Sequence, residues 1–127
     1  MKTIGAFAAG LAMLAGAALA DEVDGTWQTQ VDDGAYAYIE MGACGDKICG
    51  VISRTFNSDG EYQSENIGKQ LVWDMVAKGN GEYRDGQIWQ PSTDNIYRSK
   101  MSLDGDILRV SGCVVVICKK QTWARIR

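Results

Sequence analysis

Short runs in which apolar and polar residues alternate cover most of the chain beyond its first 24 residues. In residues 35–44, the odd-numbered positions carry alanine, isoleucine or methionine, whereas Tyr36, Tyr38 and Glu40 occupy even-numbered ones. A repeat of two residues is typical of a strand that buries one face. Residues 95–103 alternate in the same way, with Tyr97 expected on the inner face. No segment in this part of the chain shows a sustained helical repeat, so we expect an all-β protein.

Turn signals rich in glycine separate these runs. Several are Asp-Gly or Asn-Gly pairs, which favour tight hairpins, and they recur about every ten residues. Residues 81–84 and 87–90 are expected to form a hairpin around Asp85-Gly86, residues 57–69 a long polar loop, and residues 70–77 either a short strand or a helical turn. The remaining strands are expected over residues 25–31, 35–44, 48–56, 95–103, 107–113 and 118–126.

About eight or nine short strands in one small domain predict a closed antiparallel up-and-down β-barrel, because closure removes the exposed strand edges. Eight strands enclose a space just wide enough for side chains or for one small ligand. We expect this single domain to span residues 21–127, since about 100 residues is an ordinary domain size.

The first 20 residues have the layout of a secretory signal peptide. Lys2 is followed by an uncharged stretch of small and apolar residues, and Ala18-Leu19-Ala20 precedes the acidic Asp21. The apolar stretch is shorter than the roughly 20 residues of a spanning helix. We therefore expect cleavage after Ala20, a periplasmic or secreted protein, and no transmembrane segment.

Four cysteines form two pairs with the same spacing, Cys44 with Cys49 and Cys113 with Cys118. An even number of cysteines in a small exported protein indicates disulfides. Cysteines five positions apart cannot bond within one straight strand, but they face each other across a hairpin with a four-residue loop. We predict the two local disulfides. The alternatives are cross-pairing of the two hairpins and a four-cysteine zinc site, which the exported location disfavours.

Charge and composition exclude several classes of function. The net charge is −3, and without a basic block this argues against nucleic acid and does not favour an anionic membrane surface. The chain has no histidine, which removes the Ser-His-Asp and Cys-His nucleophiles and histidine-ligated metals. We expect a protein that is not an enzyme and needs no cofactor or metal. A hydrolase built on carboxylates alone is the weaker alternative.

Several short motifs occur in a fixed order along the chain. They are Gly25-Thr26-Trp27, Cys44-Gly45-Asp46, Ile48-Cys49-Gly50, residues 86–91 (GQIWQP), residues 97–101 (YRSKM), residues 108–113 (LRVSGC) and residues 121–125 (QTWAR). Together they resemble an uncharacterised family of exported bacterial proteins known as domain of unknown function 2147. The resemblance covers nearly all of residues 21–127 and implies a small lipocalin-like β-barrel.

The resemblance also implies structural roles for two residues at the ends of the barrel sequence. Lipocalins begin with Gly-x-Trp on the first strand, and an arginine near the end of the barrel packs over that tryptophan. Trp27 and Arg125 match these positions, and a guanidinium stacks well on an indole face. The chain is shorter than ligand-carrying lipocalins, so the resemblance does not by itself imply a large cavity.

Aromatic residues are the main candidates for a binding site. Four tryptophans are many for this length. Trp27 and Trp123 are expected to fill the core, while Trp73, Trp89 and Tyr97 are expected to line a site for an apolar or planar ligand. Glu40 is a further candidate if its side chain points inward. The interpretation that we favour for Glu40 places it with Tyr36 and Tyr38 on the solvent face.

An apolar tetrapeptide, Val114-Val115-Val116-Ile117, lies between the last two cysteines. If these cysteines bond, it occupies a hairpin tip, where it would contact an envelope protein, a membrane surface or a second copy. The alternatives are that it folds over the barrel or lies in a buried strand with a different disulfide. The first functional hypothesis is thus a module that binds a small apolar or amphipathic molecule. The alternative is a cell-envelope protein-interaction module acting through its surface loops.

Overall fold

The computed structural model describes residues 20–127, and these form an all-β structure. The predicted signal peptide falls almost entirely on residues 1–19, which lie outside the described residues. The strands are β1 (Gly25–Gln28), β2 (Tyr36–Cys44), β3 (Lys47–Asn57), β4 (Gly60–Tyr62), β5 (Gln70–Gly79), β6 (Glu82–Gln90), β7 (Asn95–Asp104), β8 (Ile107–Val114) and β9 (Ile117–Arg125).

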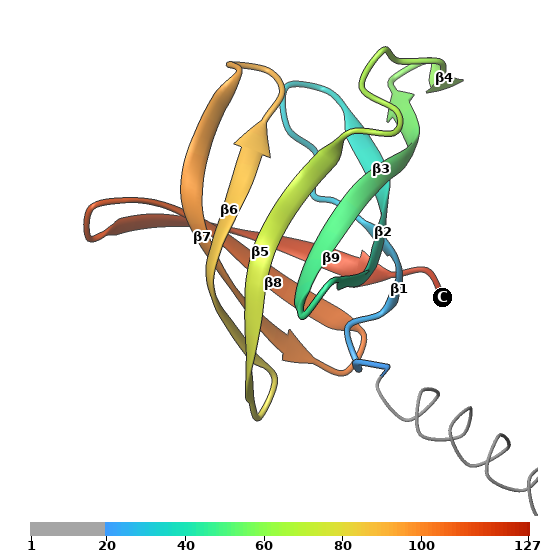
Figure 1. The fold of residues 1–127 in the computed structure, drawn as a ribbon. Coiled ribbons are helices and arrows are strands. Elements are labelled where there is room, and N and C mark those ends of the chain that lie inside the picture. The colour runs from blue at the N-terminus through green and yellow to red at the C-terminus, as the bar shows by residue number, and fades with distance from the viewer. Residues whose placement is uncertain (1–19) are drawn as a thin grey trace, which may run out of the picture.

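The strands close into an antiparallel barrel (Figure 1). Neighbours in sequence pair with each other, except that β5 pairs with β3 rather than with β4. Strand β1 closes the ring by pairing with both β2 and β9. Strand β4 pairs only with the end of β3, so eight strands make the barrel and one extends it. The predicted fold class is confirmed.

Three local predictions were wrong or incomplete. Residues 70–79 form the full strand β5, and the expected polar loop contains the short strand β4. Asp85-Gly86 is not a hairpin turn but lies inside β6, where the register shifts. Asp85 takes a φ of 65° there, and Gly86 points inward, where a Cβ would meet the side chain of Met75. The dipeptide therefore makes a bulge, which uses the same left-handed conformation as a tight turn.

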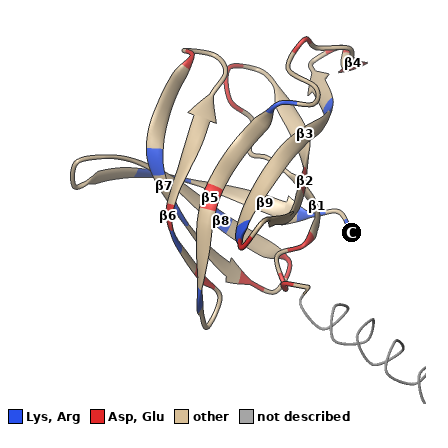
Figure 2. Cartoon of the chain, in the orientation of Figure 1, with Lys and Arg blue, Asp and Glu red and all other residues tan. Residues whose placement is uncertain are grey.

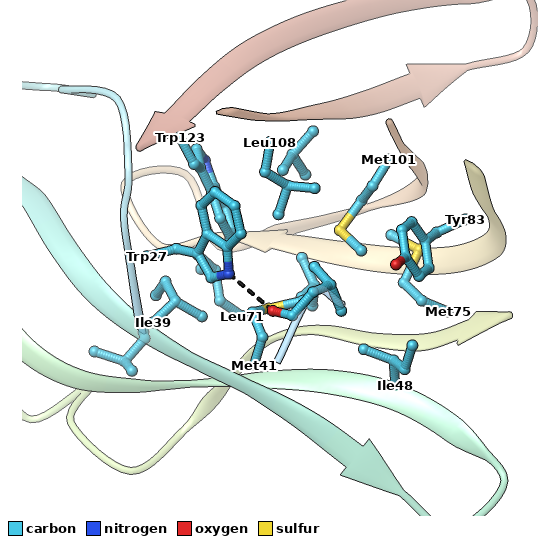
Figure 3. Close-up of a cluster of buried hydrophobic side chains, with 14 residues drawn as sticks. Trp27, Ile39, Met41, Ile48, Leu71, Met75, Tyr83, Met101, Leu108 and Trp123 are labelled. Atoms are coloured by element: carbon cyan, nitrogen blue, oxygen red, sulfur yellow. Dashed lines mark hydrogen bonds between the residues drawn. The ribbon is translucent and has the colours of Figure 1, made fainter. Parts of the chain in front are cut away.

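Large side chains fill one half of the barrel (Figure 3). Trp27, Trp123, Leu108 and Met75 are fully buried there. They come from β1, β9, β8 and β5. The buried Leu108 and Val110 of β8 show the two-residue alternation. The buried Val72 and Met75 of β5 are three residues apart, with Asp74 between them at a φ of 61°. This half is a packed core, and it defines the closed end of the barrel.

The segment before β1 covers the closed end. Val23 is fully buried, and its carbonyl accepts a 2.9 Å hydrogen bond from Nε1 of Trp27. The hydroxyl of Tyr83 donates to the carboxylate of Asp21. Burial, followed by this hydrogen bond, raises the pKa of Tyr83 well above its ordinary value. These two hydrogen bonds help to hold the N-terminal segment against the closed end of the barrel.

Both disulfides are local. Cys44 bonds to Cys49 across the β2–β3 turn, and Cys113 bonds to Cys118 across the β8–β9 turn. The local pairing predicted from the spacing is the one found. Among the described residues there is no helix of the length and apolarity needed to cross a membrane.

Candidate ligand-binding cavity

A cavity of about 740 Å³ opens at the end of the barrel opposite the Trp27 and Trp123 core. It lies among the first residues of β2, β5, β7 and β9 and the last residues of β3, β6 and β8. The barrel is therefore filled at one end and hollow at the other.

The space exists because small residues stand at inward positions near the open end. Ala37 precedes the buried Ile39 and Met41 on the inner face of β2, and it lines the cavity. Gly112 has the same place on β8, two residues beyond the buried Val110. An alanine and a glycine leave unfilled the volume that larger side chains occupy at the closed end.

The deepest part of the cavity is apolar. Ile52, Leu71, Ile88 and Val110 all contribute to its lining. Ile52, Leu71 and Val110 are almost completely buried, with exposed fractions of 3%, 7% and 1%. A ligand group that reaches this floor has aliphatic side chains around it, which favours an apolar group.

Nearer the mouth, amide and hydroxyl groups join the lining. Gln90 Oε1 accepts hydrogen bonds from the Thr93 and Tyr97 hydroxyls, at 3.1 and 3.4 Å. Its Nε2 donates to Asp32 Oδ2 at 3.3 Å. Deeper in the cavity, Gln121 pairs with Val110 and accepts a 3.0 Å hydrogen bond from Nε1 of Trp123. The cavity thus has a largely apolar floor with one amide, and a polar mouth.

Ser99 stands out among the buried polar residues. It points inward on β7, between Tyr97 and Met101, and only 4% of it is exposed. Its Oγ has no hydrogen-bond partner among the described residues. Most buried hydroxyls in proteins have a hydrogen-bond partner. Ser99 Oγ is thus an unsatisfied hydrogen-bonding group, one inward position deeper in the barrel than Tyr97.

Two of the predicted ligand residues line the cavity. Tyr97 faces inward on β7, and Trp89 lies at the end of β6. The Trp89 indole donates a 2.9 Å hydrogen bond to Asp94, and the Lys69 ammonium lies 5.5 Å from the ring centroid. Asp94 and Lys69 therefore hold the indole in place at the edge of the mouth.

Trp73 lies elsewhere. It lines a shallow outer groove of about 290 Å³ together with Lys69, Gln70, Trp89 and Ile96. Trp73 and Val72 are neighbours on β5, and Val72 is fully buried in the core, so Trp73 points to the outside of the barrel. Trp89 contributes to both spaces.

Glu40 is on the solvent face of β2. It is exposed, and its carboxylate accepts hydrogen bonds from Thr26 Oγ1 at 2.6 Å and Ser53 Oγ at 2.9 Å. These contacts join β1, β2 and β3 on the outer surface. Glu40 does not contribute to the cavity lining.

Sequence reasoning missed most of the cavity. Ile52, Leu71, Ile88 and Val110 are aliphatic residues in strands, and each looks like an ordinary core position. The signal that points to the cavity is the pair of small inward residues, Ala37 and Gly112, placed where larger side chains would otherwise fill the barrel.

Comparisons with known proteins agree with this architecture. Residues 25–125 match the profile of a family described as an uncharacterized protein conserved in bacteria, DUF2147. No curated protein matches the chain. A solved structure of protein HP1028 from Helicobacter pylori, described as belonging to the lipocalin family, is similar with a TM-score of 0.67 at 16% identity, over 84% of each chain. At this identity the likeness shows the fold alone.

Proposed function

Because this chain belongs to the DUF2147 family of bacterial proteins and has a lipocalin-like barrel, we propose that it binds a small amphipathic molecule in its open-end cavity. The observation that carries the proposal is the cavity itself. Its volume of about 740 Å³ falls within the range of roughly 300–1,000 Å³ that is usual for small-molecule sites.

The lining favours one orientation of the ligand. Ile52, Leu71 and Val110 would surround its apolar part at the floor, while Gln90 near the mouth would contact its polar end. Most of the stabilisation would come from apolar area removed from water, about 25 cal/mol for each Å². The polar groups would set direction and specificity.

The chemistry of the lining supports a binding protein rather than an enzyme. The chain has no histidine. Two carboxylates, Asp32 and Asp33, belong to the lining, and Asp32 already accepts hydrogen bonds from Gln90 and Ser92. We propose a non-enzymatic role.

We place this role in the periplasm or outside the cell. The two disulfides favour an oxidising compartment. The signal-peptide pattern of residues 1–20 supports the same location.

The test is a titration of the purified protein with the apolar fluorescent probe N-phenyl-1-naphthylamine. The variant Ala37→Phe places a large side chain in the cavity, and the matched control Ala124→Phe adds the same group at an exposed position of β9. We expect Ala37→Phe to weaken probe binding about tenfold or more, the loss of roughly 1.4 kcal/mol or more, while Ala124→Phe binds as the wild type does. Equal probe affinity in all three proteins, with folding intact, would rule out the cavity as the binding site.

A further inference from the structure

The hairpin that joins β8 and β9 ends in four exposed aliphatic residues. The exposed fractions of Val114, Val115, Val116 and Ile117 are 59%, 81%, 85% and 71%. The hairpin projects from the side of the barrel (Figure 1), and the Cys113–Cys118 disulfide closes it directly behind the tip. Exposed aliphatic groups gathered at one point are unfavourable in water and mark a contact surface. We call these four residues the apolar tip.

The turn at the apolar tip also places the backbone of one residue in an unfavourable conformation. Val114 pairs with Ile117, so Val115 and Val116 alone make the turn, and Val115 has a φ of 55°. Two-residue hairpin turns with positive φ normally use glycine, asparagine or aspartate, and a β-branched residue is a rare outlier there. Neither the exposure nor the backbone conformation of Val115 helps the protein to fold, which points to a role in binding.

A group of cations lies behind the apolar tip on the outer face of β7, β8 and β9. Lys100 pairs with Ser111, and Ser111 pairs with Lys120, so both lysines flank one serine in the same row. At the usual strand spacing they stand roughly 10 Å apart. Arg98 pairs with Cys113 in the next row toward the tip. We call Arg98, Lys100 and Lys120 the cationic face (Figure 2). Lys119 pairs with the inward-facing Gly112 and points to the cavity side of β9.

Acidic residues are few on the three strands that carry the cationic face, and the exposed Asp85 lies across from Lys100 in the bulge of β6. Residues 95–127 contain seven of the 13 Lys and Arg residues but only two of the 16 Asp and Glu residues, and both of these lie in the β7–β8 turn region. None of the ion pairs among the described residues includes a residue of the cationic face. The net charge of −3 is therefore unevenly distributed, and β7, β8 and β9 carry an excess of positive charge.

The apolar tip also adjoins the cavity. Val114 and Ile117, the two ends of the tip, both line the cavity mouth, and so do Lys119 and Lys120. A surface that receives the apolar tip would thus lie against the opening of the barrel.

We propose that the apolar tip and the cationic face together dock this protein on an anionic lipid bilayer. The four aliphatic side chains would enter the region between headgroups and acyl chains, and the cations would contact lipid phosphates. A bilayer fits better than a protein because the tip carries no aromatic ring and no hydrogen-bonding side chain, so it has apolar area but no means of specific recognition. Docking in this way does not require the proposed ligand, although it would bring the cavity mouth to the membrane.

The test is flotation of the oxidised, ligand-free protein with vesicles of equimolar phosphatidylglycerol and phosphatidylcholine, compared with vesicles of phosphatidylcholine alone. We expect binding to the anionic vesicles only, and weakening as salt is raised. The double substitution V115D/V116D should abolish binding. Neutralising two cations in K100Q/K120Q should weaken binding roughly 25-fold, since each basic residue near an anionic surface contributes about fivefold.

Matched controls separate docking from general effects. The substitution I126D places one aspartate on another exposed apolar residue, outside the tip. The double substitution K47Q/K78Q removes two exposed cations from the turns at the closed end. Both controls should float with anionic vesicles as the wild type does, and circular dichroism of every variant should match the wild type.

Three results would overturn the proposal. They are no flotation of the wild type, equal flotation with both kinds of vesicle, and unchanged flotation of V115D/V116D.

Light scattering measures whether the protein forms a dimer instead. If the wild type does not bind vesicles but forms a dimer that V115D/V116D disrupts, the apolar tip is a contact between two copies and bilayer docking is excluded. Failure of probe binding to the cavity would leave these vesicle results standing.

Discussion

The guanidinium of Arg125 lies over the indole ring of Trp27, with Cζ 4.4 Å from the ring centroid. The same guanidinium donates to the carbonyls of Glu22 and Asp24 at 2.9 and 3.2 Å, and to the carboxylate of Asp106 at 3.0 Å. One side chain near the end of β9 therefore joins the first strand, the segment before it and the β7–β8 turn at the closed end of the barrel.

We expect Arg125→Ala to lower the free energy of unfolding by about 2–4 kcal/mol, because it removes a cation–π contact and several charge-assisted hydrogen bonds. Arg125→Lys should recover less than half of this, since an ammonium cannot stack flat on the ring and reach three acceptors at once. Urea unfolding measures both values. The control Arg84→Ala, which breaks an exposed 3.4 Å ion pair with Glu82, should change stability by less than about 1 kcal/mol. Equal losses for Arg84→Ala and Arg125→Ala would contradict this role.

The buried Tyr83 predicts a loss of stability at alkaline pH. Burial and the hydrogen bond to Asp21 raise the pKa of Tyr83 above the ordinary value of about 10. A raised folded pKa means that the unfolded chain releases this proton first, so the stabilisation is complete below about pH 10 and declines as pH rises beyond it. The decline should approach 1.4 kcal/mol for each pH unit, and Tyr83→Phe should remove that component. The same slope in Tyr83→Phe and in the exposed control Tyr62→Phe would argue against it.

Two glycines on neighbouring strands should respond in opposite ways to a single methyl group. A Cβ at Gly50 would collide with Met41 and lie 2.7 Å from Cγ2 of Ile39, whereas a Cβ at Gly42 would meet nothing within 4 Å. We expect Gly50→Ala to cost about 1–3 kcal/mol through overpacking. Gly42→Ala should be neutral or stabilise by up to about 1 kcal/mol. Thermal unfolding of the two variants checks the difference. Equal unfolding temperatures would show that the core around Met41 accommodates the added methyl group without strain.

The unsatisfied hydroxyl of Ser99 predicts a substitution that increases the stability of the protein. Because Ser99 Oγ is buried and has no partner among the described residues, Ser99→Ala should raise the free energy of unfolding by about 1 kcal/mol. The control is Thr55→Val, which removes a hydroxyl that donates a 2.6 Å hydrogen bond to the carbonyl of Tyr62 and should lower stability by about 1 kcal/mol. A loss of stability in Ser99→Ala would mean that its hydroxyl is bonded in solution.

The barrel could be predicted from local patterns because a strand's alternation has a period of two residues. The inner and outer positions of residues 35–44 follow from their order alone, and the spacing of Cys44 and Cys49 limits their geometry in the same local way. Asp85-Gly86 could not be assigned by such reasoning, because a tight turn and a bulge need the same local conformation. The contact of Gly86 with Met75, from another strand, decides between them.

The cavity and the two parts of the docking surface depend on residues that only the closed barrel brings together. Ala37 and Gly112 each leave a little space, and this becomes a cavity because they stand at the same end of the barrel. Lys100 and Lys120 are ordinary exposed lysines until the register of β7, β8 and β9 sets them in one row. The sequence by itself determined which side of each strand is buried, because that depends on neighbouring residues. The tertiary structure decided where the barrel is hollow and where its charge gathers, because volume and electrostatic potential sum over side chains from distant strands.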